Sequence, residues 1–395
     1  MGPISIDRAH ARRDTAEPGI SVTVVRTRAE LRALSEDWSA LVARTERPNI
    51  FLSPEWVAVW LEHYAAETEL RSLVAHRRDE LIGVAPLLID TVGRLRRREL
   101  RFIGNGQAAP EHLEFVCAPG DATEVARAFA STIAAFDDVD LVRFDDLRET
   151  GPTIDALLQA LQVRAWRTST AVGSTCLYLP IEGTWDDRLS TLSRNARQQI
   201  RRMPRRLEQR TGASVKCCST EAEVLAALDA LERWNPQRWS ARGMESAFAD
   251  ATFASFHRAF ALVALRAGWL RLAVVGTDTQ TMAVFYAFHH CGIASFYNAA
   301  FDPAYADLAV GQVVFASAIE AAHADGLVEY DFLRGDYDYK RRWDPLERST
   351  VSVRATSGSA RGRLWRRAAT VRGLVASVMA RLPAGARTAI DRVRP

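Results

Sequence analysis

Residues 330–343, YDFLRGDYDYKRRW, concentrate side chains that can move protons. Asp331 ends an apolar, strand-like run, and Asp336 follows a glycine turn. Tyr339 and Lys340 come next, and Lys340 is one of only two lysines in the chain. A carboxylate can take a proton from a nucleophile, whereas a phenol can give one and an ammonium can bind an anion. The pattern predicts either an acid–base site or a solvated turn beside a buried, paired Asp331.

A second chemical feature is the segment FDPAYADLAVGQVV, residues 301–314. A strand-like run reaches Phe301, a loop with a proline follows, and a helical pattern begins near Leu308 with Gly311 in its first turn. The first N–H groups of a helix are unpaired and lie at its positive end, so they suit a phosphate, and a glycine lets the ligand approach the backbone. Close helix packing explains the same glycine equally well.

Glu111 and His112 follow a proline turn in the first half of the chain. They are either site residues or ordinary polar residues of an exposed loop. His289 and His290 lie in a strand-like run, where they must face opposite sides, and the five cysteines form no metal-ligand spacing. We therefore expect no metal.

Residues 184–210 predict an amphipathic helix with an arginine face, interrupted or kinked at Pro204. Such a face is most often solvated or paired with acidic neighbours, but arginine forks also bind anionic substrates. We single out Arg197 and Arg201 as the members to test for binding of an anionic substrate.

Strand-like and helix-like patterns alternate along the whole chain, and a hairpin is expected within residues 70–90. This mixture predicts an α/β fold with mixed (α+β) sheets in two similar halves. We place a flexible leader at residues 1–19, an N-terminal domain at 20–172, a C-terminal domain at 173–355 and a basic amphipathic tail at 356–395.

Composition excludes several classes of protein. The 395 residues carry a net charge of only +3, which does not indicate a nucleic-acid binder, and no segment resembles a signal peptide or a membrane span. Serine-hydrolase, P-loop and zincin motifs are absent from the sequence. We expect a cytoplasmic protein, with a possible peripheral contact at the inner membrane surface through residues 361–395, which could equally dock on the protein's own core.

The sequence from SFYNAAFDPAYADLAVGQVV to EYDFLRGDYDYKRRW resembles the C-terminal half of the acetyltransferase-6 family, GNAT-related proteins similar to CelD-like and FemAB-like acyltransferases. The block NIFLSPEWVAVW and the basic run SRNARQQIRRMPRRLE agree with the same family, so the resemblance covers about residues 20–355.

The resemblance implies tandem GNAT-like domains, the second of which binds acetyl-CoA or another acyl-CoA. The residues expected to contact this donor are Ala309, Val310, Gly311, Gln312 and Asn298. Those expected to act in catalysis are Asp331, Asp336, Tyr339, Lys340 and Glu111. Those expected to contact the acceptor are Arg197, Arg201, Arg334, Trp343 and His112.

The expected function is acyl-CoA-dependent N-acyl transfer to an amino group of an envelope, polysaccharide or related small-molecule precursor. One alternative is a FemAB-like transferase that takes its acyl group from aminoacyl-tRNA, although the chain lacks sustained heptads for a coiled-coil arm. Another is a non-catalytic GNAT-fold scaffold in polysaccharide synthesis, which the degenerate donor-binding signature DLAVGQVV favours.

Overall fold

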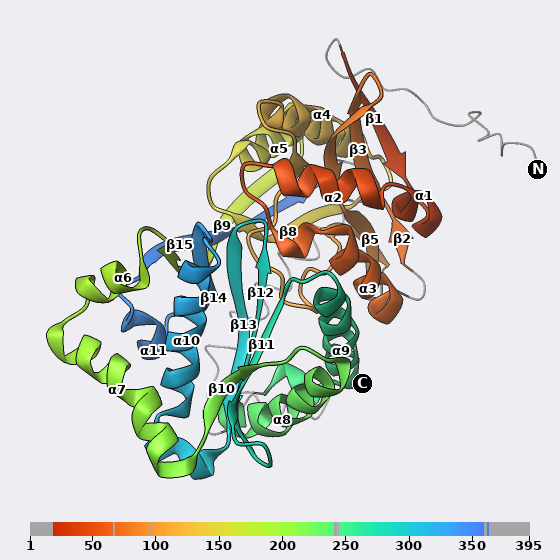
Figure 1. The fold of residues 1–395 in the computed structure, drawn as a ribbon. Coiled ribbons are helices and arrows are strands. Elements are labelled where there is room, and N and C mark those ends of the chain that lie inside the picture. The colour runs from red at the N-terminus through yellow and green to blue at the C-terminus, as the bar shows by residue number, and fades with distance from the viewer. Residues whose placement is uncertain are drawn as a thin grey trace, which may run out of the picture.

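The computed structural model describes residues 19–65, 68–94, 96–240, 243, 245–358 and 362. Figure 1 shows two halves with long strands running between them and helices packed around both. The predicted leader and the predicted basic tail lie almost wholly outside the described residues. Among the helices of the described part, none has the length and apolar character needed to cross a membrane.

The N-terminal half contains a small antiparallel sheet with strand order β1-β3-β4-β7. Its strands are β1 (Ile20–Val25), β3 (Ser72–Arg77), β4 (Glu80–Ala85) and β7 (Val116–Cys117). The helices of this half are α1 (Arg28–Ala33), α2 (Ser35–Arg44), η1 (Ile50–Leu52), α3 (Pro54–Tyr64), α4 (Ala122–Ala134) and α5 (Pro152–Val163). The expected hairpin is confirmed as the antiparallel pair β3–β4.

A second, longer sheet extends through both halves in the order β10-β11-β12-β13-β14-β9-β15-β8-β6-β5-β2. Its strands from the first half are β2 (Glu69–Leu70), β5 (Leu87–Val92), β6 (Arg97–Phe102), β8 (Leu141–Arg148) and the linking β9 (Arg167–Pro180). Those from the second half are β10 (Ser214–Cys217), β11 (Leu270–Gly276), β12 (Thr281–His290), β13 (Ile293–Phe301), β14 (Glu329–Arg334) and β15 (Leu346–Thr356).

The two halves exchange their last strands. Each half has one parallel pair in this sheet, β6 with β8 and β13 with β14. Strand β9 follows the first half in sequence but pairs with β14, whereas β15, at the end of the second half, pairs with β8. The boundary that we predicted after residue 172 therefore lies inside β9, and β9 and β15 bind the halves together through their own long antiparallel pairing.

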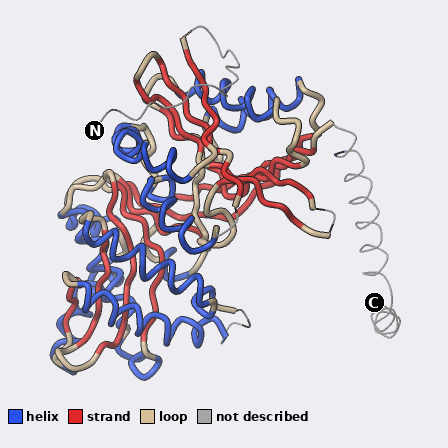
Figure 2. Tube along the Cα trace, turned by 90° about the vertical axis from the view of Figure 1, so that its right-hand side faces the viewer, coloured by secondary structure: helices blue, strands red, loops and turns tan. Residues whose placement is uncertain are grey.

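Helices cover both faces of the sheet in the C-terminal half (Figure 2). They are α6 (Trp185–Thr191), α7 (Arg194–Thr211), α8 (Glu221–Ser240), η2 (Ala247–Ala249), α9 (Ala251–Arg266), η3 (Pro303–Leu308), α10 (Val310–Ala324) and α11 (Asp338–Arg341). Side chains of a strand alternate between faces, so β12 places Tyr286 in the core with α8 and α9 and Phe285 in the core with α10.

The helix predicted over residues 184–210 is two helices. The first ends at Thr191, and Ser193 starts the second because its hydroxyl accepts a hydrogen bond from the Ala196 N–H and so caps α7. Pro204 does not interrupt α7, which continues to Thr211. The interruption that we assigned to the proline therefore lies about a dozen residues earlier.

Candidate active site

A cavity of about 710 Å³ lies where β13 and β14 separate. The two strands are paired only from Ile293 to Ser295 and from Glu329 to Asp331. The later part of β13 lines the cavity together with α7, α10 and the segment that follows β14. We call this the α10 cavity. Parted strands have backbone groups that no neighbouring strand pairs, so a ligand can enter between them.

The first turn of α10 forms one end of the cavity. Ala309 is in the left-handed conformation, and no side chain caps the helix. The unpaired N–H groups and the positive end of the dipole therefore suit an anionic group of a ligand. A Cβ added to Gly311 would meet only Phe301 Cδ1, at an ordinary 3.7 Å. This contact gives little support to the alternative that Gly311 serves close packing.

Six of the predicted residues meet in the wall of the α10 cavity, four of them at the helix start: Ala309, Val310, Gly311, Gln312, Tyr339 and Trp343. Tyr339 packs its ring against Phe315 of α10, with ring centroids 5.1 Å apart. Arg342, which we did not single out, is the positively charged residue among those lining this cavity.

Asn298 and Asp336 lie outside this wall. The Asn298 side chain accepts a hydrogen bond of 2.7 Å from the Asn235 amide of α8, on the opposite face of the sheet. Asp336 is half exposed and forms a two-bond ion pair with Arg341. Asp336 is thus satisfied by a surface partner, and the geometry offers no role for it as a base.

Lys340 is buried, and its ammonium donates hydrogen bonds to backbone carbonyl oxygens of β14. Its Nζ donates to the carbonyl oxygens of Phe332, Leu333 and Arg334 at 2.8, 3.2 and 2.6 Å. An ammonium has three N–H donors, and these carbonyls occupy all three. We expected Lys340 to bind a phosphate or an acceptor carboxylate. Its ammonium instead holds the carbonyl oxygens at the end of β14, which is a structural role.

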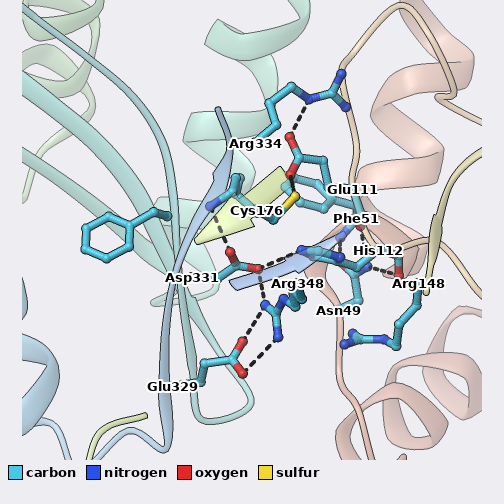
Figure 3. Close-up of polar contacts among 12 residues, drawn as sticks. Asn49, Phe51, Glu111, His112, Arg148, Cys176, Glu329, Asp331, Arg334 and Arg348 are labelled. Atoms are coloured by element: carbon cyan, nitrogen blue, oxygen red, sulfur yellow. Dashed lines mark hydrogen bonds and ion pairs between the residues drawn. The ribbon is translucent and has the colours of Figure 1, made fainter. Parts of the chain in front are cut away.

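On the other face of β14, Asp331 meets His112 from the first half of the chain (Figure 3). Asp331 Oδ2 lies 3.2 Å from His112 Nε2 and 2.5 Å from Arg348, and Oδ1 accepts the Leu333 N–H. Burial would raise the pKa of the Asp331 carboxyl, but His112 and Arg348 hold it well below its usual value. Asp331 therefore stays ionised and is a fixed negative charge beside the imidazole.

The ring of His112 is positioned by its surroundings. The residue is 3% exposed, and neither ring nitrogen forms a hydrogen bond of good geometry with the described residues, although Nε2 lies 3.2 Å from Asp331 Oδ2. Its backbone is in the left-handed region, with φ at 55°. The Asn49 amide holds this loop by donating to the carbonyl oxygens of Glu111 and His112 at 2.8 and 3.0 Å (Figure 3). One ring nitrogen, Nε2, therefore faces a fixed carboxylate.

We call His112 and Asp331 the dyad. Glu111 and Arg334 form a second contact between the halves, an ion pair next to this dyad. Arg334 also approaches Asp146 at 3.4 Å. Cys176 of β9 donates its thiol to Glu111 Oε2 at 3.2 Å. Together with the dyad and Arg348, these residues form what we call the interface cluster. The sequence indicated four members, whereas Asp146, Cys176 and Arg348 were missed because nothing local marks a residue within a strand.

Glu111, His112 and Cys176 also offer three metal-ligand atoms that lie within 4.8 Å of one another. Spacing along the chain concealed this group, since Cys176 is far from the other two. Burial, and then the neighbouring Glu111 carboxylate, raise the pKa of the Cys176 thiol well above its usual value. A metal ligand must be the thiolate, so a metal here would have to displace the thiol proton and compete with Arg334 for Glu111.

Arg197 and Arg201 line neither the α10 cavity nor the interface cluster. They are on α7 and line a separate cavity of about 870 Å³ between α7, α10 and β10. Arg201 pairs with Asp186 at 2.6 Å on the exposed surface.

Two GNAT-like domains with a separated parallel strand pair define an acyltransferase fold. The chain belongs to the family described as Acetyltransferase (GNAT) domain, whose model matches residues 5–91 and 194–341, more than half of the sequence. The expected family and the expected fold class are thus confirmed.

Solved structures agree with this fold. A crystal structure of FemX matches with a TM-score of 0.61 at 13% identity, over 81% of this chain and 95% of that chain. A conserved protein of unknown function from Bacteroides thetaiotaomicron VPI-5482 matches with a TM-score of 0.52 at 14% identity, over 85% and 100%. At such identities the likeness concerns the fold. No curated protein sequence matches significantly.

Proposed function

We propose that the protein is an acyl-CoA-dependent N-acyltransferase, with the acyl-CoA in the α10 cavity and the acceptor amine on the side of the interface cluster. The observation that carries this proposal is the position of the cavity, at the separation of β13 and β14 and against the uncapped start of α10. This arrangement has an anion site for one phosphoryl group and a slot between strands for an extended thiol arm.

In this proposal the two faces of β14 contact different substrates. Phe332 packs in the core with α10, whereas Asp331, its neighbour along the strand, points to the interface cluster. A donor between the strands and an acceptor from the cluster side would therefore meet at the end of β14. Acetyl-CoA is the simplest donor, and the acceptor that we propose is a small-molecule amine of an envelope or polysaccharide precursor.

In the proposed reaction the amine nitrogen forms a bond to the thioester carbon, and the carbon–sulfur bond breaks. His112 takes the amine proton, and Asp331 stabilises the imidazolium that forms. Tyr339, in the wall of the α10 cavity, gives a proton to the leaving thiolate and regains one from solvent, and the His112 imidazolium releases its proton to solvent. The products are an amide and free CoA thiol, so atoms and protons balance. Backbone N–H groups on the separated strand edges hold the oxyanion.

Calorimetry with CoA, followed by a thiol-release assay with acetyl-CoA and longer acyl-CoAs across amino-sugar and amino-acid acceptors, tests the proposal. We expect CoA to bind and to raise the melting temperature, because a ligand of the folded state stabilises it. Absence of CoA binding would remove the donor assignment. Transfer from aminoacyl-tRNA without CoA binding would select the FemAB-like alternative, and neither activity would select the scaffold.

A further inference from the structure

Helix α7 is strongly basic and largely unpaired. Its eighteen residues include seven arginines and one acidic residue. Arg201 pairs with Asp186 and Arg210 with Asp307. The arginines that form no ion pair with a described residue are Arg194, Arg197, Arg202, Arg205 and Arg206. The helix therefore presents an excess of positive charge that its own surroundings do not balance.

This excess works against the stability of the helix. Arg194 and Arg197 lie in the first turn, which contains no acidic residue, although the positive end of a helix disfavours cations. Arg201 and Arg205 are four positions apart, as are Arg202 and Arg206, and like charges at this spacing repel. An anion bound along α7 would relieve both effects, which is the reason to look for one.

The arginines border a concave site. A cavity of about 870 Å³ is lined by Arg194, Arg197, Arg201, Arg202 and Arg205, with α10 and β10 forming the opposite walls. We call it the arginine groove. It also contains two carboxylates, Glu208 and Glu320. Five guanidinium groups outnumber these carboxylates, so the groove favours an anion.

Shape and chemistry narrow the class of ligand. Guanidinium forks match phosphate oxygens with two parallel hydrogen bonds. A cavity of this size suits a small molecule, whereas a membrane surface or a long nucleic-acid backbone needs a flat or extended face. The apolar side of α7 is not free to enter a membrane, because Met203 and Leu207 pack in the core with α10. Phosphoryl groups on a small molecule fit best.

We propose that the arginine groove binds the phosphoryl groups of one of the two substrates. The inference rests on the proposed transfer reaction, and two sources have this chemistry: the 3′-phosphate and diphosphate of the CoA donor, or the diphosphate of a nucleotide-linked amine acceptor. The groove shares Ile200 of α7 with the α10 cavity, so both sites lie along the same helix.

Neighbouring arginines supply a matched pair of variants. Arg205 and Arg206 are both exposed and lack an ion pair with the described residues, but only Arg205 lines the groove. We would measure the binding of CoA, dephospho-CoA and UDP by calorimetry to the wild type, Arg197→Gln/Arg205→Gln and Arg206→Gln. We expect the double variant to lose about tenfold in affinity for the phosphorylated ligand. Arg206→Gln should keep wild-type affinity, and the free double variant should melt no lower than the wild type because repulsion is relieved.

The three ligands distinguish the sources. A loss for CoA but not for dephospho-CoA assigns the groove to the 3′-phosphate, a loss for both CoA forms assigns it to the donor diphosphate, and a loss for UDP alone assigns it to the acceptor. Equal losses in both variants, unchanged binding in the double variant, or an arginine dependence seen only with tRNA or anionic vesicles would overturn the proposal. UDP binding in Gly311→Leu, which fills the α10 cavity, separates failure of the groove from failure of the donor site.

Discussion

His112 Nε2 lies 3.2 Å from Asp331 Oδ2, although the two residues belong to different halves of the chain. Both are buried, and the carboxylate stays ionised between the imidazole and Arg348. Neither half of the chain contains both members of this dyad, so this part of the candidate site forms only when the halves pack together. It joins a loop before β7 to the strand that forms one side of the separated pair.

The dyad should be needed for turnover rather than for donor binding. We expect Asp331→Asn to lower kcat by about 10²–10⁴-fold, because the imidazole loses its fixed partner, and to leave the affinity for CoA nearly unchanged. Glu329 still pairs with Arg348 in this variant, which favours retention of the fold. Asp336→Asn is the control on an exposed carboxylate of the same segment. A similar loss of kcat in the control would contradict the assignment of the base.

The two lysines of the chain should behave differently. Lys340→Met leaves three carbonyl oxygens without their donor, so we expect the free energy of unfolding to fall by about 3 kcal/mol or more. Lys216, exposed and paired with Asp278, provides the control, and Lys216→Met should change stability by no more than about 0.5 kcal/mol. Urea titration measures both. A Lys340→Met protein of normal stability but without activity would restore a catalytic role.

A large side chain in place of Gly311 should fill part of the α10 cavity. Gly311→Leu places a side chain in the cavity wall, and we expect the KM for acyl-CoA to rise about tenfold or more with little loss of stability, since the space is open. Ala324→Leu, at the exposed far end of the same helix, should leave KM unchanged. Unaltered donor kinetics in Gly311→Leu would place the acyl-CoA elsewhere.

Acid should destabilise the fold through His257. This residue is fully buried among aromatic rings, including those of Phe253 and Tyr297 at 4.4 and 4.5 Å, and burial lowers its pKa to about 3. Between the unfolded value of about 6.5 and pH 3, the unfolded state binds a proton that the folded state does not. Stability from this group is complete above pH 6.5 and falls by about 1.4 kcal/mol per pH unit below it.

His257→Gln should make this dependence shallower. Urea unfolding at a series of pH values between 7 and 4 measures the slope for the wild type and the variant. Identical slopes would show that other groups carry the acid sensitivity.

Much of the architecture was readable from local pattern. Alternation along β12 and β13, the glycine at the start of α10 and the turn after β14 could be predicted because each depends on neighbours in sequence. Family membership followed from the same local blocks and is confirmed. The four residues at the start of α10 that we expected to contact the donor lie together in the wall of one cavity, since consecutive residues of one helix turn stay together in any fold.

Tertiary structure decided the rest. Whether Lys340 binds a ligand or three backbone carbonyls depends on where β14 ends relative to α11, and whether Asp331 is a base or a permanent charge depends on His112 and Arg348. The exchange of β9 and β15 between the halves brings Cys176 and Arg348 to the interface. The sequence by itself determined the residue types, the elements and the family. Contacts between distant segments determined the charges and roles, because burial and pairing exist only once those segments pack together.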